Sequence, residues 1–343
     1  MPGPFRLGFL SHLHGTPDSR RLYRDYVELF VAAEELGFDS VWVAQHHFDA
    51  SSGGLPSPFP FLAAVAERTS RIRLGTAVVT LPLEDPLRVA EDAAVLDALS
   101  GGRVELGVGS GAGPDAFAAF GRNFGSRRED NSAAVKVLTA ALAGQPIDGT
   151  ELRLQPTAPS LAERVWQAAF SLNGASYVGA AGSRLLLNRA VFGATERTDA
   201  VQAPWAEAYL AARRATAGEA APGQAPVRIG LSRGVFPAAD KRRAKAAIEA
   251  PVMRMAQRMV KAGLFAGDLG VEECFERLHI SYGSPEEVAA RLASDLVLPL
   301  ATDLIVQFSP AAPPLDEAIA ALELLATQVA PELGWQPRRG DPG

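Results

Sequence analysis

The sequence is dominated by one alternation, in which short β-branched apolar runs are followed by loops and by longer stretches with apolar residues at helical spacing. Eight such runs occur. Because each pair of parallel strands needs a helical crossover, eight units predict a closed (β/α)8 TIM barrel, with a doubly wound open sheet as the alternative. The expected strands are residues 5–11, 40–46, 72–79, 103–109, 165–172, 185–191, 227–235 and 303–309.

No stretch between these units has the composition of a domain linker, so we expect a single domain over residues 1–336 and a flexible tail over 337–343. The chain is longer than the roughly 250 residues of a minimal barrel, and the extra length lies mainly in two segments. Residues 144–164, rich in Gly and Pro, predict an excursion before the fifth strand. Residues 263–282 predict a long insertion after the seventh strand, a loop of the kind that often forms a lid over a barrel's site. Helices are expected near residues 20–36, 57–69, 86–99, 126–143, 174–182, 198–217, 238–262, 284–295 and 314–330.

Charge and apolar patterning exclude several classes of partner. The 33 basic and 39 acidic side chains give a net charge of −6 and form no basic stripe, so nucleic acid is not an expected partner. No apolar run approaches the roughly 20 residues of a membrane helix, and no secretory signal is recognisable. The single cysteine cannot form an intramolecular disulfide. We therefore expect a cytoplasmic protein without a membrane partner.

In a barrel the chemistry lies at the C-terminal ends of the strands. His12 and His14 follow the first strand, a spacing with which metal-dependent amidohydrolases bind one metal ion. That class also needs histidines after the fifth and sixth strands and an aspartate after the eighth. The fifth and sixth runs contain no histidine, and Asp303 opens the eighth run instead of closing it, so we expect no metal site. Other polar candidates at strand ends are Gln45, His46, His47, Asn173, Ser176, Asn188, Arg189, Ser232 and Arg233.

The glycine-rich run 107–113 follows the fourth expected strand. Glycines there let the backbone approach a phosphate or a ring closely, but a tight turn explains them as well. A dinucleotide fingerprint would also require the open sheet that is the less favoured fold.

Residues 37–48 (GFDSVWVAQHHF) resemble a segment that the bacterial luciferase-like monooxygenases carry at the same place. The resemblance spans nearly the whole chain and is strongest over residues 5–125. It implies a barrel enzyme, usually dimeric, that takes reduced FMN from a separate flavin reductase and reacts it with O2 and a small organic substrate. Further similar segments are residues 74–82, 85–92, 96–97, 100–103 and 283–288.

Carried over by position, the resemblance makes His46 the catalytic residue, an imidazole that moves a proton beside the flavin. It also implies a cis peptide bond between Ala77 and Val78, packed against the flavin ring. The segment 173–177 matches the family's phosphate-binding turn, although Ser176 could equally serve as the N-cap of the helix that follows. The residues expected to bind the cofactor are Ala77, Val78, Gly109, Ser110, Asn173, Gly174, Ala175, Ser176 and Tyr177.

Two positions depart from the luciferases themselves. Gln45 replaces a glutamate beside the histidine pair, and Ser110 replaces an arginine that reaches the flavin phosphate. These departures predict flavin binding unlike that of luciferase and no light emission. They also leave two alternatives open: a deazaflavin-dependent reductase or dehydrogenase of the same superfamily, and a flavin-binding protein without catalysis. The sequence does not identify the substrate.

Overall fold

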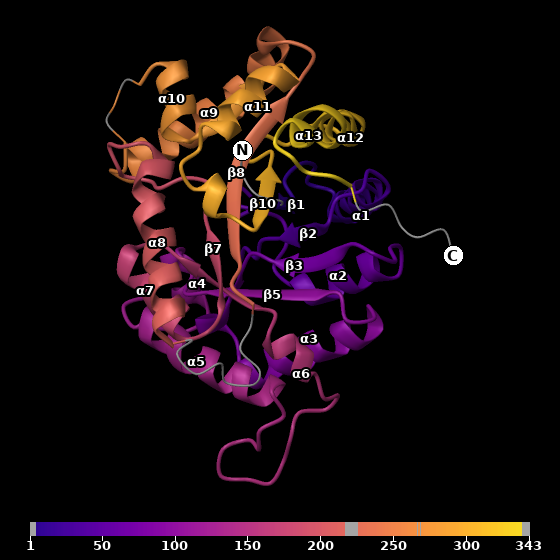
Figure 1. The fold of residues 1–343 in the computed structure, drawn as a ribbon, viewed down its shortest axis with the longest axis vertical. Helices are drawn as coiled ribbons and strands as arrows, with labels where there is room; N and C mark the ends of the chain where they lie inside the picture. Colours follow the sequence, from indigo (N-terminus) through magenta and orange to yellow (C-terminus); the bar gives the residue numbers. More distant parts are fainter. Residues whose placement is uncertain (1–4, 217–225, 266, 268, 338–343) are drawn as a thin grey trace.

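The computed structural model describes residues 5–216, 226–265, 267 and 269–337. Eight parallel strands close into a barrel, because β10 pairs with β1 on one side and with β8 on the other (Figure 1). The predicted TIM barrel is therefore confirmed. Around the ring, the strands are β1 (Arg6–Ser11), β2 (Ser40–Val43), β3 (Arg73–Thr76), β5 (Val104–Gly109), β6 (Val165–Ala169), β7 (Arg184–Leu187), β8 (Ile229–Pro237) and β10 (Asp303–Gln307).

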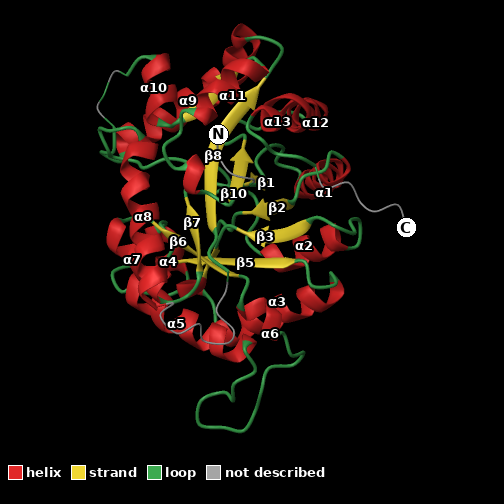
Figure 2. Cartoon of the chain, in the orientation of Figure 1, coloured by secondary structure: helices red, strands yellow, loops and turns green. Residues whose placement is uncertain are grey.

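Helices lie outside the ring and cover the strands (Figure 2). Most of them fall where the apolar spacing predicts them. Three short helices in loops, α4 (Pro114–Ala119), α6 (Pro159–Ala162) and α10 (Val271–Arg277), have too few residues for a periodic pattern and were not predicted. The main helices are α1 (Ser19–Glu35), α2 (Pro58–Ala66), α3 (Pro86–Leu99), α5 (Arg127–Leu142), α7 (Leu172–Ala180), α8 (Thr198–Thr216), α9 (Lys241–Lys261), α11 (Pro285–Ala293) and α12 (Leu315–Leu324). The short ones are α4 (Pro114–Ala119), α6 (Pro159–Ala162), α10 (Val271–Arg277) and α13 (Ala330–Glu332), with 3-10 turns at Leu81–Leu83 and Leu298–Leu300 and a π-helical turn at Leu325–Val329.

The third barrel strand is interrupted near its C-terminal end. After Thr76 the peptide bond between Ala77 and Val78 is cis, as expected from the sequence, and the chain resumes pairing as β4 (Val79–Thr80). β3 and β4 both pair with β5, so the interruption leaves the ring closed.

The segment 263–282 is not the long loop that its three glycines suggested. Within it α10 buries Cys274 and Phe275, and β9 (Ile280–Gly283) pairs with the far end of β8. β8 is long enough for both neighbours: its residues 230–234 pair with β10, and its residues 234–237 pair with β9. Figure 1 shows β8 extending beyond the ring toward α9 and α11.

The segment 144–164 is an irregular excursion that ends in α6, and it projects from the barrel at the bottom of Figure 1. Of the expected tail, residues 338–343 lie outside the described part of the chain. Among the described helices, none is long and apolar enough to cross a membrane.

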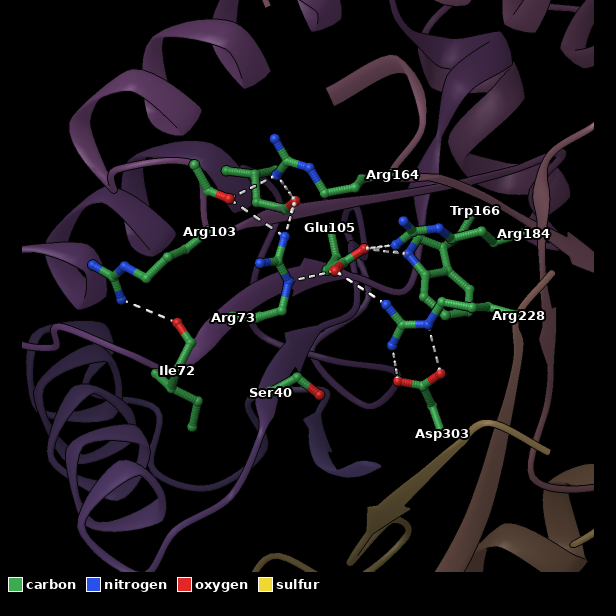
Figure 3. Close-up of polar contacts among 12 residues, drawn as sticks. Ser40, Ile72, Arg73, Arg103, Glu105, Arg164, Trp166, Arg184, Arg228 and Asp303 are labelled. Atoms are coloured by element: carbon green, nitrogen blue, oxygen red, sulfur yellow. Dashed lines mark hydrogen bonds and ion pairs between the residues drawn. The ribbon is translucent and has the colours of Figure 1, made fainter. Parts of the chain in front are cut away.

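Inside the barrel, a charged layer closes the N-terminal end. Glu105 accepts hydrogen bonds from Arg73, from Arg184 Nη1 at 2.6 Å and from Trp166 Nε1 at 2.7 Å, and Arg228 pairs with Asp303 (Figure 3). Burial opposes ionisation of Glu105, but the three guanidinium groups outweigh it and hold the pKa of this carboxyl below its usual value.

Above the charged layer lies an apolar one. The rings of Trp42 and Trp166 meet edge to face, with centroids 5.5 Å apart, beside Leu10, Leu186 and Ile305. The indole of Trp42 occupies space that a side chain on residue 75 would need, because a Cβ there would stand 2.1 Å from the ring. Gly75 therefore allows the tryptophan to fill the barrel, and this layer forms the floor of the mouth.

Candidate active site

Imidazole side chains line the mouth of the barrel, at the C-terminal ends of its strands. On β1 the side chains of Leu10 and then His12 point to the interior, two residues apart. His12 Nδ1 lies 2.8 Å from His46 Nε2, and His12 Nε2 lies 3.2 Å from Gln307 Oε1. Gln307 in turn donates through Nε2 to Ser232 Oγ at 2.6 Å.

This chain of contacts fixes which nitrogens carry protons. Because Gln307 Oε1 can only accept, His12 donates from Nε2 and its Nδ1 accepts from His46 Nε2. His46 then keeps a free lone pair on Nδ1. The two imidazoles form a directed pair, and His46 Nδ1 is its proton-accepting atom.

The three histidines of the mouth are neutral at neutral pH. Burial lowers the pKa of His46 to about 4, and burial with the nearby guanidinium of Arg258 lowers that of His14 to about 4. Burial and the His46 imidazole hold the pKa of His12 well below its usual value. All three histidines thus have pKa values below the ordinary value of about 6.5.

Gln45 fixes the loop that carries His46. Its amide donates to Glu84 Oε1 at 2.8 Å and to the Pro56 carbonyl at 3.1 Å, and accepts from Thr80 N at 2.7 Å. The amide thus ties β2 to β4 and to the loop after His46, a holding role that does not require the luciferases' glutamate. The neighbouring His47 instead packs edge-on against Phe120, with ring centroids 5.0 Å apart.

The sequence profile of the luciferase-like monooxygenases matches residues 5–302. The chain belongs to this family. The resemblance seen in the sequence is thereby confirmed.

Individual relatives match over shorter spans. The chain is 41% identical over 138 residues to 4-hydroxyprotoasukamycin monooxygenase of Streptomyces nodosus subsp. asukaensis, which is 40% of this chain and 37% of that protein. It is 42% identical over 109 residues to the F420-dependent glucose-6-phosphate dehydrogenase of Amycolatopsis mediterranei, 31% of this chain and 33% of that protein. Each match thus spans about a third of the relative's length.

Solved structures share the fold over almost the whole chain. Monooxygenase RslO1 from Streptomyces bottropensis superposes with a TM-score of 0.79 at 24% identity, covering 96% of this chain and 100% of that one. The oxygenating constituent of 3,6-diketocamphane monooxygenase from Pseudomonas putida, in complex with FMN, superposes with a TM-score of 0.75 at 20% identity, covering 96% and 98%. At these identities the likeness establishes the fold.

In this member of the luciferase-like family, small residues line the β3–β5 side of the mouth. Ala77, Val78 and Ala168 pack against the apolar floor, and a Cβ on Gly109 would stand 2.9 Å from Val78 Cγ2. The absence of a side chain at 109 therefore makes room for the side chain of Val78.

The segment 173–177, expected to bind the flavin phosphate, lies within a helix that begins earlier than predicted. α7 begins at Leu172, and its cap is Ser171, whose Oγ accepts from Gly174 N at 3.1 Å. Ser176 is therefore the fifth residue of the helix, and the suggestion that it is the N-cap is wrong. Asn173 and Tyr177 are exposed, Ala175 is buried, and Ser110 lies at the end of the neighbouring strand β5.

Other polar candidates are placed differently. Ser232 and Arg233 lie within β8 and not after it, because the strand begins and ends two residues later than predicted. Ser232 joins the Gln307 chain, whereas Arg233 pairs with Asp295. Arg258 of α9, which influences His14, was not singled out because no local signal marks it. In the described ranges, no group of three or more His, Cys, Asp or Glu side chains is arranged to hold a metal ion.

Proposed function

We propose that this protein is the oxygenase component of a two-component system that uses reduced FMN and O2 to oxidise a small organic substrate. The observation that carries the proposal is the directed pair of His12 and His46 at the C-terminal end of the barrel, the end at which Ala77, Val78 and Ala168 cover the apolar floor. Family membership supports it, as does a 32% identity over 110 residues to the oxygenase component of the flavin-dependent trigonelline monooxygenase of Acinetobacter baylyi, 31% of this chain and 30% of that protein.

The residues of the mouth fit a flavin. A planar ring needs a surface without long side chains, which Ala77, Val78 and Ala168 offer at the same end of the barrel as the histidines. A phosphate needs donors at a helix start, which the first turn of α7 offers, with Ser176 one turn further along. Reduced FMN, when bound, would supply the two electrons with which one atom of O2 enters the substrate and the other leaves as water.

The chain's own groups have two tasks in this reaction. His46 accepts or returns a proton through Nδ1, while His12 and Gln307 hold its ring and keep Nε2 protonated. The apolar layer of Trp42 and Trp166 excludes water from below. Neutral imidazoles suit this role, since a permanently charged ring could not accept a proton.

The partners that we propose are O2, a small organic substrate and a separate flavin reductase. We also propose a cytoplasmic homodimer, as the family resemblance implies. Light scattering of the purified protein at several concentrations tests the dimer directly.

A second candidate is a hydride transfer with the deazaflavin F420. The identity to an F420-dependent dehydrogenase favours it, as does Ser110, which takes the place of a phosphate-binding arginine. Thermal stability with added FMN or F420 separates the two, because the cofactor that binds raises the unfolding midpoint by mass action.

The test of the proposed function is coupled oxidation with reduced FMN, O2 and a panel of candidate substrates. We expect His46→Ala to bind FMN normally but to lower the yield of product per flavin oxidised by on the order of 100-fold. His47→Ala is the matched control, because that ring packs on Phe120, and it should retain coupling. Equal yields from His46→Ala and its parent would end the assignment, and FMN binding without oxygen consumption would favour a non-catalytic flavoprotein.

A further inference from the structure

Arg189 is a buried guanidinium without a charged partner. It follows β7, it is 8% exposed, and its Nη1 has no hydrogen-bond partner. Among the residues that the structure describes, no carboxylate forms an ion pair with it, and its aromatic contact is the ring of Phe192 at 5.7 Å. The buried arginines Arg164, Arg228 and Arg233, by contrast, each pair with an aspartate.

The groups around Arg189 are neutral or positive. His12 and His14 stand at the end of β1, and Arg258 approaches from α9, where its Nη1 donates to the Ser51 carbonyl at 3.2 Å. Burial and Arg258 lower the pKa of Arg189 to about 10, the direction expected when no anion is near.

The carboxylate of Asp49, which acts on His14 and Arg258, forms no ion pair with Arg189. Asp49 lies in the loop after β2 and interacts electrostatically with His14, His46 and Arg258. Its oxygens already accept from Ser51 N at 2.9 Å, from Ser51 Oγ at 2.6 Å and from Ser52 Oγ at 2.5 Å. With the two guanidinium groups of Arg189 and Arg258 against the single carboxylate of Asp49, this side of the mouth keeps an excess of positive charge.

The backbone that carries Arg189 is held rigidly. Gln202 donates through Nε2 to the carbonyl oxygen and to Oδ1 of Asn188, at 2.8 and 2.9 Å, and Arg233 Nη1 donates to the same carbonyl at 3.3 Å. A buried charge held in place without a partner costs stability, and such groups are typically retained for a ligand.

We propose that Arg189, together with His14 and Arg258, binds the carboxylate of an anionic substrate at the mouth of the barrel. A guanidinium offers the planar fork of donors that matches a carboxylate. The substrate class is then small organic acids with an apolar body that rests on the floor of Trp42 and Trp166. Naming the acid as the substrate rests on the proposed function, whereas the binding of the acid does not.

The flavin phosphate is the other anion that could meet this charge. We place it at α7, which follows β6, whereas the groups that influence Arg189 are the histidines at the end of β1 and Arg258 of α9. The experiment therefore includes FMN and riboflavin, which differ by that phosphate.

Calorimetric titration with benzoate and with benzyl alcohol tests the proposal, on the full chain with and without FMN. We expect benzoate to bind and the alcohol to bind at least 10-fold more weakly. Arg189→Met should weaken benzoate by roughly 10- to 100-fold, the scale of a lost charge-assisted hydrogen bond. Arg258→Met should weaken it too, while Arg254→Met, an exposed arginine one turn earlier on α9, should not.

Two further readouts separate binding from structural support. Because the guanidinium has no partner, Arg189→Met should unfold at the same temperature as the parent or higher, whereas a structural arginine would lower the midpoint. Benzoate should also be taken up with a proton near pH 5, because the anion raises the pKa values of His14 and His46 from about 4. Heats in buffers of different ionisation enthalpy measure this uptake.

Equal affinity for benzoate and benzyl alcohol, or unchanged benzoate affinity in Arg189→Met, would overturn the proposal. Weaker FMN with unchanged riboflavin in that variant would also overturn it, by assigning the guanidinium to the flavin phosphate. Benzoate binding that depends on Arg189, in a protein that consumes no oxygen with reduced FMN, would support the anion site and overturn the proposed function alone.

Discussion

Gly53 stands against the ring of His46 so closely that a Cβ on residue 53 would lie 2.4 Å from His46 Cδ2. The same Cβ would lie 2.6 Å from the carbonyl oxygen of His12. One residue without a side chain thus sets the position of both members of the histidine pair. A change as small as one methyl group at this position must move one of them.

We therefore expect Gly53→Ala to lower product yield per flavin oxidised by at least 10-fold, because the 2.8 Å contact between His12 and His46 is lost. Overpacking should also lower the free energy of unfolding by about 1–3 kcal/mol. Gly113→Ala is the control, since a Cβ there meets nothing within 4 Å and should change neither quantity measurably. Parental coupling in Gly53→Ala would show that the pair tolerates displacement.

Stability should depend on pH through the histidines. The pKa of His14 is about 4 in the folded protein, against about 6.5 in the unfolded chain, so unfolding takes up protons between these values. The contribution of neutral His14 to folding stability is therefore complete above pH 6.5 and is lost as the pH decreases toward 4. His14→Asn should reduce this slope by up to about 1.4 kcal/mol per pH unit. Urea unfolding at a series of pH values measures it, and an unchanged slope would contradict the neutral buried state.

The two serines of α7 should behave differently. Ser171→Ala removes the cap of Gly174 N and should cost about 1 kcal/mol of stability. Ser176→Ala should leave the unfolding midpoint unchanged but weaken FMN by roughly 1.5–3 kcal/mol while sparing riboflavin. Thermal melts and flavin fluorescence titrations give both numbers. A loss of both ligands alike in Ser176→Ala would remove this serine from the phosphate site.

The charged layer at the base of the barrel should tolerate no broken pairs. Glu105→Gln leaves the guanidiniums of Arg73 and Arg184 without their carboxylate, and we expect a loss of about 3–5 kcal/mol of unfolding free energy. Glu28→Gln is the comparison, because its pair with Arg68 is half exposed and should contribute less than about 1 kcal/mol. Similar losses in the two variants, measured by denaturant unfolding, would contradict this difference.

The sequence was sufficient to predict the barrel because the alternation of strands and helices repeats around the entire ring. The prediction was wrong between residues 263 and 282, where three glycines suggested a loop. The segment instead contains α10, which buries Cys274 and Phe275. The Ala77–Val78 bond came from the family resemblance, since local chemistry alone argues against a cis bond there.

The positions of His12, His46 and Arg189 at strand ends identified them as candidates, but the sequence did not predict which groups they contact. That His46 donates to His12 depends on Gln307, nearly three hundred residues further along the chain. Arg258 reaches the mouth only because α9 packs over the loop at Ser51, a contact that no local pattern encodes. The cap of α7 was misplaced because both Ser171 and Ser176 satisfy the composition of a helix start.

The pairing of β9 with β8 has an evolutionary consequence. β9 is attached through residues 234–237, at and beyond the edge of the ring, while closure depends on β10 pairing with residues 230–234. The stretch from α9 to β9, which brings Arg258 to the mouth, is thus attached to a barrel whose ring of strands is closed without it. In evolution this stretch can be lengthened, shortened or exchanged, which would change the substrate specificity, while the hydrogen bonds that close the barrel stay the same.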